Sequence, residues 1–93
     1  MYKLKLTQEA QADYDWLEKC KGKNSPLMSR LNRLLRELQE HPKVGIGKPE
    51  PLKGNLSGLW SRRIDEKHRL VYEIQDSEAV VFAISMRDHY TKL

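Results

Sequence analysis

The stretch LWSRRIDEKHRLVYEIQDSEAVVFAISM, residues 59–86, decides the fold of this 93-residue chain. It contains three runs rich in apolar, aromatic and β-branched residues, at 59–64, 68–75 and 79–86. Two short polar segments, 65–67 and 76–78, separate these runs and are typical of turns. The stretch therefore predicts three consecutive strands that pair as an antiparallel meander.

The preceding residues predict two helices and one more strand. Residues 2–6 alternate between apolar and polar side chains as a short strand does. Thr7 is a suitable N-cap for a helix that runs to about Cys20, and Ser25 followed by Pro26 begins a second helix that Pro42 ends. The second helix has apolar residues at helical spacing: Leu27, Met28, Leu31, Leu34, Leu35 and Leu38. Its other side carries Arg30, Arg33, Glu37 and Glu40. Two heptads are too few for a coiled coil, so this helix is expected to pack on a sheet.

The resulting order is β-α-α-β-β-β, which predicts an α+β fold with two helices packed on one face of a small antiparallel sheet. A chain of this length accommodates one domain, residues 1–93. The opposite face of the sheet is then available for function.

Composition limits the cellular setting. No apolar run approaches the roughly 18 residues that a membrane span requires, so no membrane association is expected. The single cysteine, Cys20, excludes an intrachain disulfide and fits a reducing cytoplasm. Cys20 is most simply a buried helical residue. Because no His, Cys and carboxylate cluster has ligand spacing, neither a metal nor another cofactor is expected.

The positive charge is concentrated in the middle of the chain. Residues 43–69 hold seven Lys and Arg against three Asp and Glu, whereas residues 70–93 hold two against four. The segment 42–58 also contains three of the four prolines and four of the five glycines, which predicts a loop. Long loops in compact domains often serve a function. The basic segment could therefore meet a polyanion, or could simply be solvated surface.

Residues suited to metal-free RNA cleavage lie in this region and in the tail. Such cleavage needs a base for the 2′-hydroxyl proton, a cation for the phosphoryl oxygens and an acid for the leaving 5′-oxygen. The candidates are Lys48, Glu50 and Lys53 in the loop, Arg62, Arg63 and Arg69 on the strands, and His89 and Tyr90 in the tail.

Strand alternation separates the two adjacent arginines. Arg63 shares a face with Ser61, and Arg62 shares the other face with Trp60 and Ile64, so only one of the two arginines can line a site. Arg69 shares its face with Val71, while His68, Leu70 and Tyr72 form a largely apolar face. A charged residue at this position in a strand is a hint of function.

Each of these residues also has an ordinary structural interpretation. His89 could be solvated surface, Glu50 could be loop polarity, and the arginine pair could protect an edge strand from aggregation. Trp60 is more simply a core residue than a platform for RNA bases. Spacing leaves open whether Tyr90 is a core residue or a stacking residue.

Several motifs, in order, resemble the YoeB (Txe/YoeB) family of the RelE/ParE toxin superfamily. They are GKPEPLK at 47–53, NLSG at 55–58, WSRRI at 60–64, HRLVY at 68–72 and HY at 89–90, together with Asp13, Tyr14 and Trp16 in the first helix. The resemblance implies a microbial-ribonuclease-like fold. It also implies a type II toxin that cleaves mRNA in the ribosomal A site without a metal and so inhibits translation.

The resemblance also implies roles for individual residues. Glu50 aligns with the general base, His89 with the general acid and Arg69 with the stabiliser of the transition state. Lys53 and Arg63 match positions that hold the RNA backbone, and Tyr90 matches an aromatic residue that positions the substrate. Lys48 is a further candidate for RNA binding because of its place in the basic loop. The chain departs from the family after Tyr90, because it continues with Thr91, Lys92 and Leu93.

The expected partners follow from the same resemblance: the ribosome with its mRNA, and a neutralising YefM/Axe-like antitoxin whose acidic segment would cover the basic region. A homodimer is also possible. Two rival functions remain: a RelE/ParE-fold toxin that acts on a target other than RNA, and a non-catalytic RNA-binding module. The first generally lacks the Glu, Arg and His set. The second lacks any recognised RNA-binding signature here.

Overall fold

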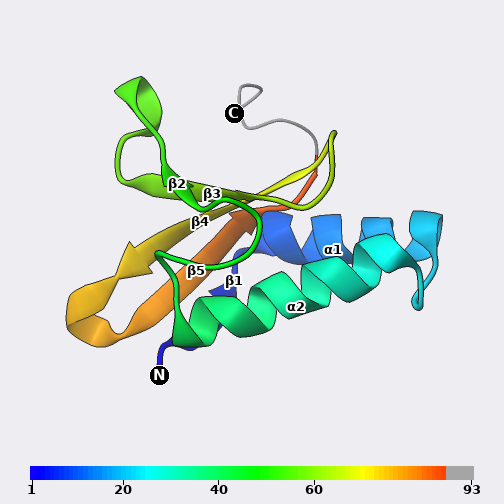
Figure 1. Cartoon of the computed structure of the whole chain (residues 1–93), viewed down its shortest axis with the longest axis horizontal. Coiled ribbons are helices and arrows are strands. Elements are labelled where there is room, and N and C mark those ends of the chain that lie inside the picture. The colour runs from blue at the N-terminus through cyan, green and yellow to red at the C-terminus, as the bar shows by residue number, and fades with distance from the viewer. Residues whose placement is uncertain (88–93) are drawn as a thin grey trace.

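The computed structural model describes residues 1–87, and these form two helices and five strands (Figure 1). The strands are β1 (Lys3–Leu6), β2 (Glu50–Pro51), β3 (Leu59–Arg63), β4 (Arg69–Gln75) and β5 (Val80–Ser85). The helices are α1 (Gln8–Lys21) and α2 (Pro26–Glu40), and two short 3-10 helices, η1 (Gly54–Leu56) and η2 (Asp76–Glu78), lie in the connections. The predicted α+β class, the two helices and the four predicted strands are confirmed, but the predicted loop at 42–58 also contains the short strand β2.

All five strands form one sheet in the order β1-β5-β4-β3-β2. The pairs β3–β4 and β4–β5 are antiparallel, as the meander predicts. The expectation of a wholly antiparallel sheet is wrong in one pair, because β1 runs parallel to β5. The two helices carry the chain from β1 at one edge of the sheet to β2 at the other edge, and the strands that follow then bring β5 beside β1. Such a long connection is what a parallel neighbour requires.

Both helices begin where their capping residues predict. The Thr7 side chain accepts a hydrogen bond from the Ala10 backbone N–H, and the Ser25 side chain accepts one from that of Met28. Figure 1 shows both helices along the same face of the sheet. The core between helices and sheet contains the predicted apolar residues of α2 together with apolar residues of α1 and of the strands. It includes Ala10, Leu17, Leu31, Leu34, Leu38, Ile64, Leu70, Tyr72, Val81 and Ala83.

Two residues in the helices differ from expectation. Cys20 is exposed near the end of α1 and is not a buried residue. Glu37 does not belong to the solvated side of α2, because its side chain is only 20% exposed and binds a buried arginine. Hydrophobic spacing alone does not reveal a carboxylate at the border of the apolar stripe that turns inward. By contrast, Trp60 packs against the core as predicted.

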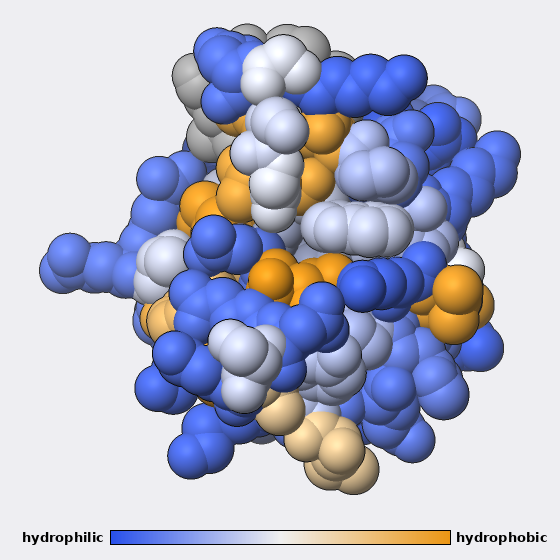
Figure 2. Space-filling model, turned by 90° about the vertical axis from the view of Figure 1, so that its left-hand side faces the viewer, coloured by the Kyte–Doolittle hydropathy of each residue, from blue (hydrophilic) through white to orange (hydrophobic). Residues whose placement is uncertain are grey.

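The surface is mostly hydrophilic on the side that carries η1 and the β4–β5 connection. Figure 2 shows the hydrophobic residues on this side as several small patches among hydrophilic ones. Within residues 1–87, neither helix is both long enough and apolar enough to cross a membrane.

Candidate functional site

Glu50 and Arg69 form an ion pair at the edge of the sheet. Arg69 Nη1 lies 3.4 Å from Glu50 Oε1, and the side chains are 17% and 53% exposed. Glu50 belongs to the short edge strand β2, and Arg69 begins β4, two strands away. The pair thus places a carboxylate accessible to solvent beside a guanidinium that is largely buried.

The register of the sheet places these residues on the face away from the helices. Glu50 is paired with Ser61, and Ser61 with Val71, so all three share a face. Arg63 is paired directly with Arg69 and lies on the same face. Ser61 and Val71 are buried, and the Ser61 hydroxyl has no hydrogen-bond partner among the described residues. Small, buried side chains thus form a floor beside the Glu50–Arg69 pair.

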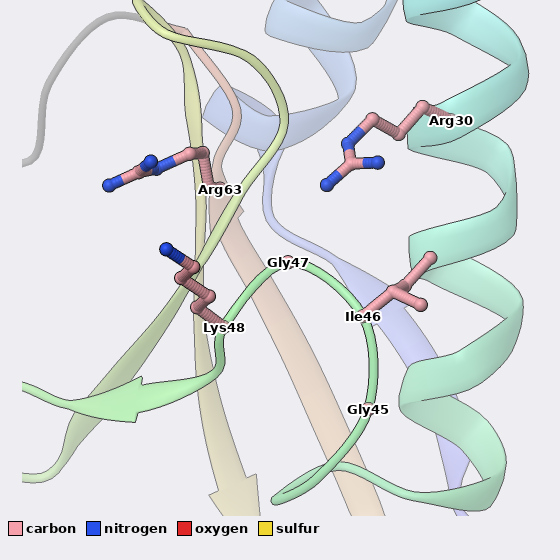
Figure 3. A pocket seen from close by; sticks show the side chains of 6 residues that line it. All are labelled: Arg30, Gly45, Ile46, Gly47, Lys48 and Arg63. Atoms are coloured by element: carbon pink, nitrogen blue, oxygen red, sulfur yellow. The ribbon is translucent and has the colours of Figure 1, made fainter.

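Lys48 and Arg63 line a pocket of about 500 Å³ together with Arg30, Gly45, Ile46 and Gly47 (Figure 3). Lys53 lines a second, smaller pocket of about 280 Å³, with Glu50, Pro51 and Leu52. The structure therefore brings Glu50, Arg69, Arg63 and Lys48 to one end of the sheet, and Lys53 lines a separate pocket with Glu50. His89 and Tyr90 lie outside the described residues.

Arg62 points to the opposite face from Arg63, as predicted, and is completely buried. Its Nη1 donates to Glu37 Oε1 at 2.6 Å, and its Nε donates to the Tyr72 hydroxyl at 3.1 Å. Its guanidinium also donates to three backbone carbonyl oxygens of the loop after α2, those of His41, Val44 and Ile46. One buried cation therefore binds a helix, a strand and a loop.

Glu37 and Tyr72 complete this network, which we call the Arg62 clamp (Glu37, Arg62 and Tyr72). Glu37 Oε1 accepts a second hydrogen bond from the Ile46 backbone N–H at 2.8 Å, and the Tyr72 hydroxyl donates to the Pro42 carbonyl at 2.8 Å. Burial is the main cause that raises the pKa of Tyr72, and the hydrogen bond from Arg62 opposes it. The clamp thereby fixes the loop that leads directly to Lys48 and Glu50.

Glycine is required where the loop passes over the clamp. A Cβ at Gly45 would lie 1.6 Å from Glu37 Oε1, and Gly45 has φ +127°. A Cβ at Gly47 would lie 3.0 Å from the Arg63 carbonyl oxygen, and the Gly47 carbonyl accepts a hydrogen bond from the Arg63 N–H at 2.7 Å. The next residue, Lys48, has φ 51°, a left-handed conformation that is uncommon for a residue with a side chain. This backbone delivers the lysine to the pocket.

The α1 motif residues hold the end of β5. The Met86 backbone N–H donates to Asp13 Oδ2 at 3.0 Å, and the Arg87 guanidinium lies 3.6 Å from the centre of the Trp16 ring. Tyr14 donates instead to Asn32 Oδ1 at 2.6 Å and so joins α1 to α2. These contacts fix the chain two residues before His89.

Arg30 was not among the predicted site residues, and Arg62 was a candidate whose role differs from the expected one. Arg30 lines the pocket from α2, although the sequence pattern shows only that it lies on the polar side of that helix. Arg62 was predicted to face away, but its role in holding the loop was not foreseen. An arginine within an otherwise apolar strand face is the one signal that could have indicated a buried partner.

No metal site is visible in the part of the chain that the structure describes, where no three His, Cys, Asp or Glu side chains are grouped as ligands. The described side chains at the sheet edge supply a carboxylate, guanidinium groups and an ammonium group.

Comparison with known proteins gives the same assignment as the motifs. Residues 6–90 match the family described as YoeB-like toxins of bacterial type II toxin–antitoxin systems. The chain belongs to this family. Toxin YoeB of Synechocystis sp. is 46% identical over 90 residues, which cover 97% of this chain and 99% of that protein. The YoeB-like chain is thus a toxin of a type II system.

Solved structures support the same family. The YoeB/ParE toxin from Agrobacterium tumefaciens superposes with a TM-score of 0.84 at 38% identity, and 95% of this chain and 99% of that chain are covered. YoeB from Staphylococcus aureus, in a YoeB–YefM complex, gives 0.78 at 34% identity, with 97% and 99% covered. The S. aureus protein has also been solved as a dimer.

Proposed function

We propose that this YoeB-like toxin is an endoribonuclease that cleaves mRNA in the ribosomal A site without a metal and so stops translation. The observation that carries the proposal is the 3.4 Å pair of Glu50 and Arg69 on the sheet face away from the helices, with Arg63 beside it. A base and a cation that are adjacent and reachable by solvent are two of the three groups that the reaction needs.

In this mechanism Glu50 removes the proton from the 2′-hydroxyl of the nucleotide before the cleaved bond. The 2′-oxygen attacks the phosphorus, and the bond to the 5′-oxygen breaks. The products are a 2′,3′-cyclic phosphate and a 5′-hydroxyl. Arg69 stabilises the charge on the phosphoryl oxygens, and its limited exposure strengthens that interaction. His89 protonates the leaving oxygen, as the family resemblance implies.

Three further cations and one aromatic residue hold the substrate. Arg63 and Lys48 bind the RNA backbone at one pocket, and Lys53 binds it at the second pocket, which Glu50 also lines. Tyr90 positions a base. Cations in two separate pockets fit an RNA strand that crosses the edge of the sheet near Glu50, because a polyanion needs contacts along its length.

Primer extension on mRNA translated in vitro tests the activity. We expect cleavage when the toxin and ribosomes are present, and much slower cleavage of the same RNA without ribosomes. Analysis of the termini should show a cyclic phosphate and a 5′-hydroxyl. A 5′-phosphate, or equally fast cleavage of free RNA, would contradict the proposed mechanism.

The proposed partners are the ribosome with its mRNA, a YefM/Axe-like antitoxin and a second copy of the toxin. The YoeB–YefM complex and the YoeB dimer of S. aureus support the last two. An acidic antitoxin segment would fit the basic region between Lys48 and Arg69. Amide exchange with and without antitoxin should show protection of that region. Unchanged exchange there in a fully inhibited complex would contradict this interface.

A further inference from the structure

The pocket lined by Arg30, Lys48 and Arg63 has a composition suited to an anion. Its three cations come from α2, the loop and β3, and the remaining lining residues are Gly45, Ile46 and Gly47. None of the three forms an ion pair with a carboxylate in residues 1–87, and no acidic residue lines the pocket. A pocket that is lined by three cations and by no carboxylate favours an anionic ligand.

The floor of the pocket is fixed before any ligand binds. The Arg62 clamp binds the carbonyls of Val44 and Ile46, and the Arg63 N–H binds that of Gly47. Figure 3 shows Lys48 and Arg63 on the same side of the loop, while Arg30 approaches Gly47 from α2. A fixed floor lowers the entropy that is lost when a ligand is bound.

The pocket also continues the line of the proposed active site. Arg63 is the register partner of Arg69, which pairs with Glu50. The cations Arg69, Arg63, Lys48 and Arg30 therefore lead from the open sheet face around the edge of the sheet to α2. A volume of about 500 Å³ falls within the range of about 300–1,000 Å³ typical of small-molecule sites. It is large for a lone phosphate ion and suits a nucleotide unit.

We propose that this pocket binds a phosphodiester of the RNA substrate outside the cleaved position, with Arg30 as a phosphate ligand. This inference rests on the proposed function, in that the bound polyanion is taken to be RNA. Guanidinium groups bind phosphate oxygens through paired N–H donors, and two of the three cations are arginines. A row of cations leading away from Glu50 suits a strand with regularly spaced charges.

Binding of RNA that cannot be cleaved tests the proposal. Two 2′-O-methyl RNAs are used at low salt, a trinucleotide that covers the active site and a nonanucleotide that extends beyond it on both sides. The variant is Arg30→Gln, and its matched control is Arg36→Gln, which removes the same charge from an exposed position of α2 outside the pocket. Arg30→Lys keeps the charge.

Arg30→Gln should weaken binding of the long RNA on the order of 5-fold, the scale of one lost polar contact, and leave the short RNA unchanged. The slope of log affinity against log salt should fall by about 0.7, as for one phosphate contact to a single strand. Arg36→Gln should change neither value, and Arg30→Lys should restore most of the slope. Equal losses in the two Gln variants, or an equal loss for both RNAs, would overturn the proposal.

Two further results separate this proposal from its alternatives. A glutamate-rich peptide matched in charge to the long RNA should bind weakly and respond little to Arg30→Gln. If the peptide responds as strongly as the RNA, the pocket serves a protein partner, and the proposal is wrong. It is also wrong if the unmodified toxin fails to bind the long RNA at low salt. Because this assay needs no cleavage, failure of the nuclease mechanism would leave a positive binding result intact.

Discussion

The Glu37→Gln variant should be much less stable than the unmodified toxin, because the buried Arg62 guanidinium loses its counter-charge. Arg62 is 0% exposed, and Glu37 Oε1 lies 2.6 Å from its Nη1. Removing one partner of a buried ion pair costs about 3–5 kcal/mol. The Glu37 side chain is 20% exposed, so water replaces part of the lost interaction. The expected loss is therefore about 3 kcal/mol, at the lower end of that range.

Urea unfolding followed by tryptophan fluorescence measures this loss. In a protein of this size about 3 kcal/mol corresponds to a fall of roughly 12–24 °C in Tm. Glu40→Gln is the matched control, since Glu40 lies on the same helix and is exposed. It should change the free energy of unfolding by less than about 0.5 kcal/mol. If Glu37→Gln lowers the free energy of unfolding by no more than Glu40→Gln does, the buried Arg62 does not need Glu37 as its counter-charge, and the energetic reasoning is refuted.

Exchange of the Ile46 amide shows whether the clamp holds the loop as well as the core. This N–H donates to Glu37 Oε1, so its exchange should accelerate in Glu37→Gln by more than that of the β4 amides. Cleavage by the still-folded variant should then slow through kcat, because Lys48 and Glu50 follow this loop. Equal acceleration at Ile46 and in β4 would mean that the clamp supports the core without positioning the loop.

Three other perturbations give distinct expectations. Glu50→Ala, Arg69→Ala and His89→Ala should each slow single-turnover cleavage by at least about 100-fold, and a loss below about 10-fold would remove that residue from the mechanism. Lys48→Gly should be more stable than Lys48→Ala by about 1 kcal/mol in urea unfolding, because glycine tolerates φ 51°, and equal stabilities would contradict a strained Lys48. Tyr72→Phe should be less stable than the unmodified toxin, and this difference in the free energy of unfolding should shrink as pH rises above 10.0. The reason is that burial raises the pKa of Tyr72, so ionisation of this tyrosine favours the unfolded state. A difference that grows with pH in urea titrations would contradict this reasoning.

The sequence predicted the elements well because their signals are local. The caps at Thr7 and Ser25 and the spacing of the leucines act within one or two turns of a helix. Strand alternation placed Arg62 and Arg63 on opposite faces for the same reason. The parallel pairing of β1 with β5 could not be read in this way, because it joins residues almost 80 positions apart.

The candidate site was predicted in part. Motifs in sequence order identified Glu50, Arg69, Arg63 and Lys48, and the structure places these four at one sheet edge. Arg30 was missed because its pocket depends on how closely the loop approaches α2. Strand alternation separated Arg62 from Arg63 but did not predict what Arg62 binds. Arg62 faces away from the site but holds the loop, so its removal should act through folding and loop position.

An edge strand of two residues explains why the site needs such a clamp. β2 consists of Glu50 and Pro51 only, and Pro51 has no N–H to extend the pairing. A short edge strand leaves the open sheet face accessible, but its few backbone hydrogen bonds give Glu50 little support. The buried Arg62 supplies that support from the opposite face, while Arg63, the next residue, faces the proposed substrate. Adjacent arginines in one strand thus serve the two needs of this edge, a fixed loop and a cationic surface.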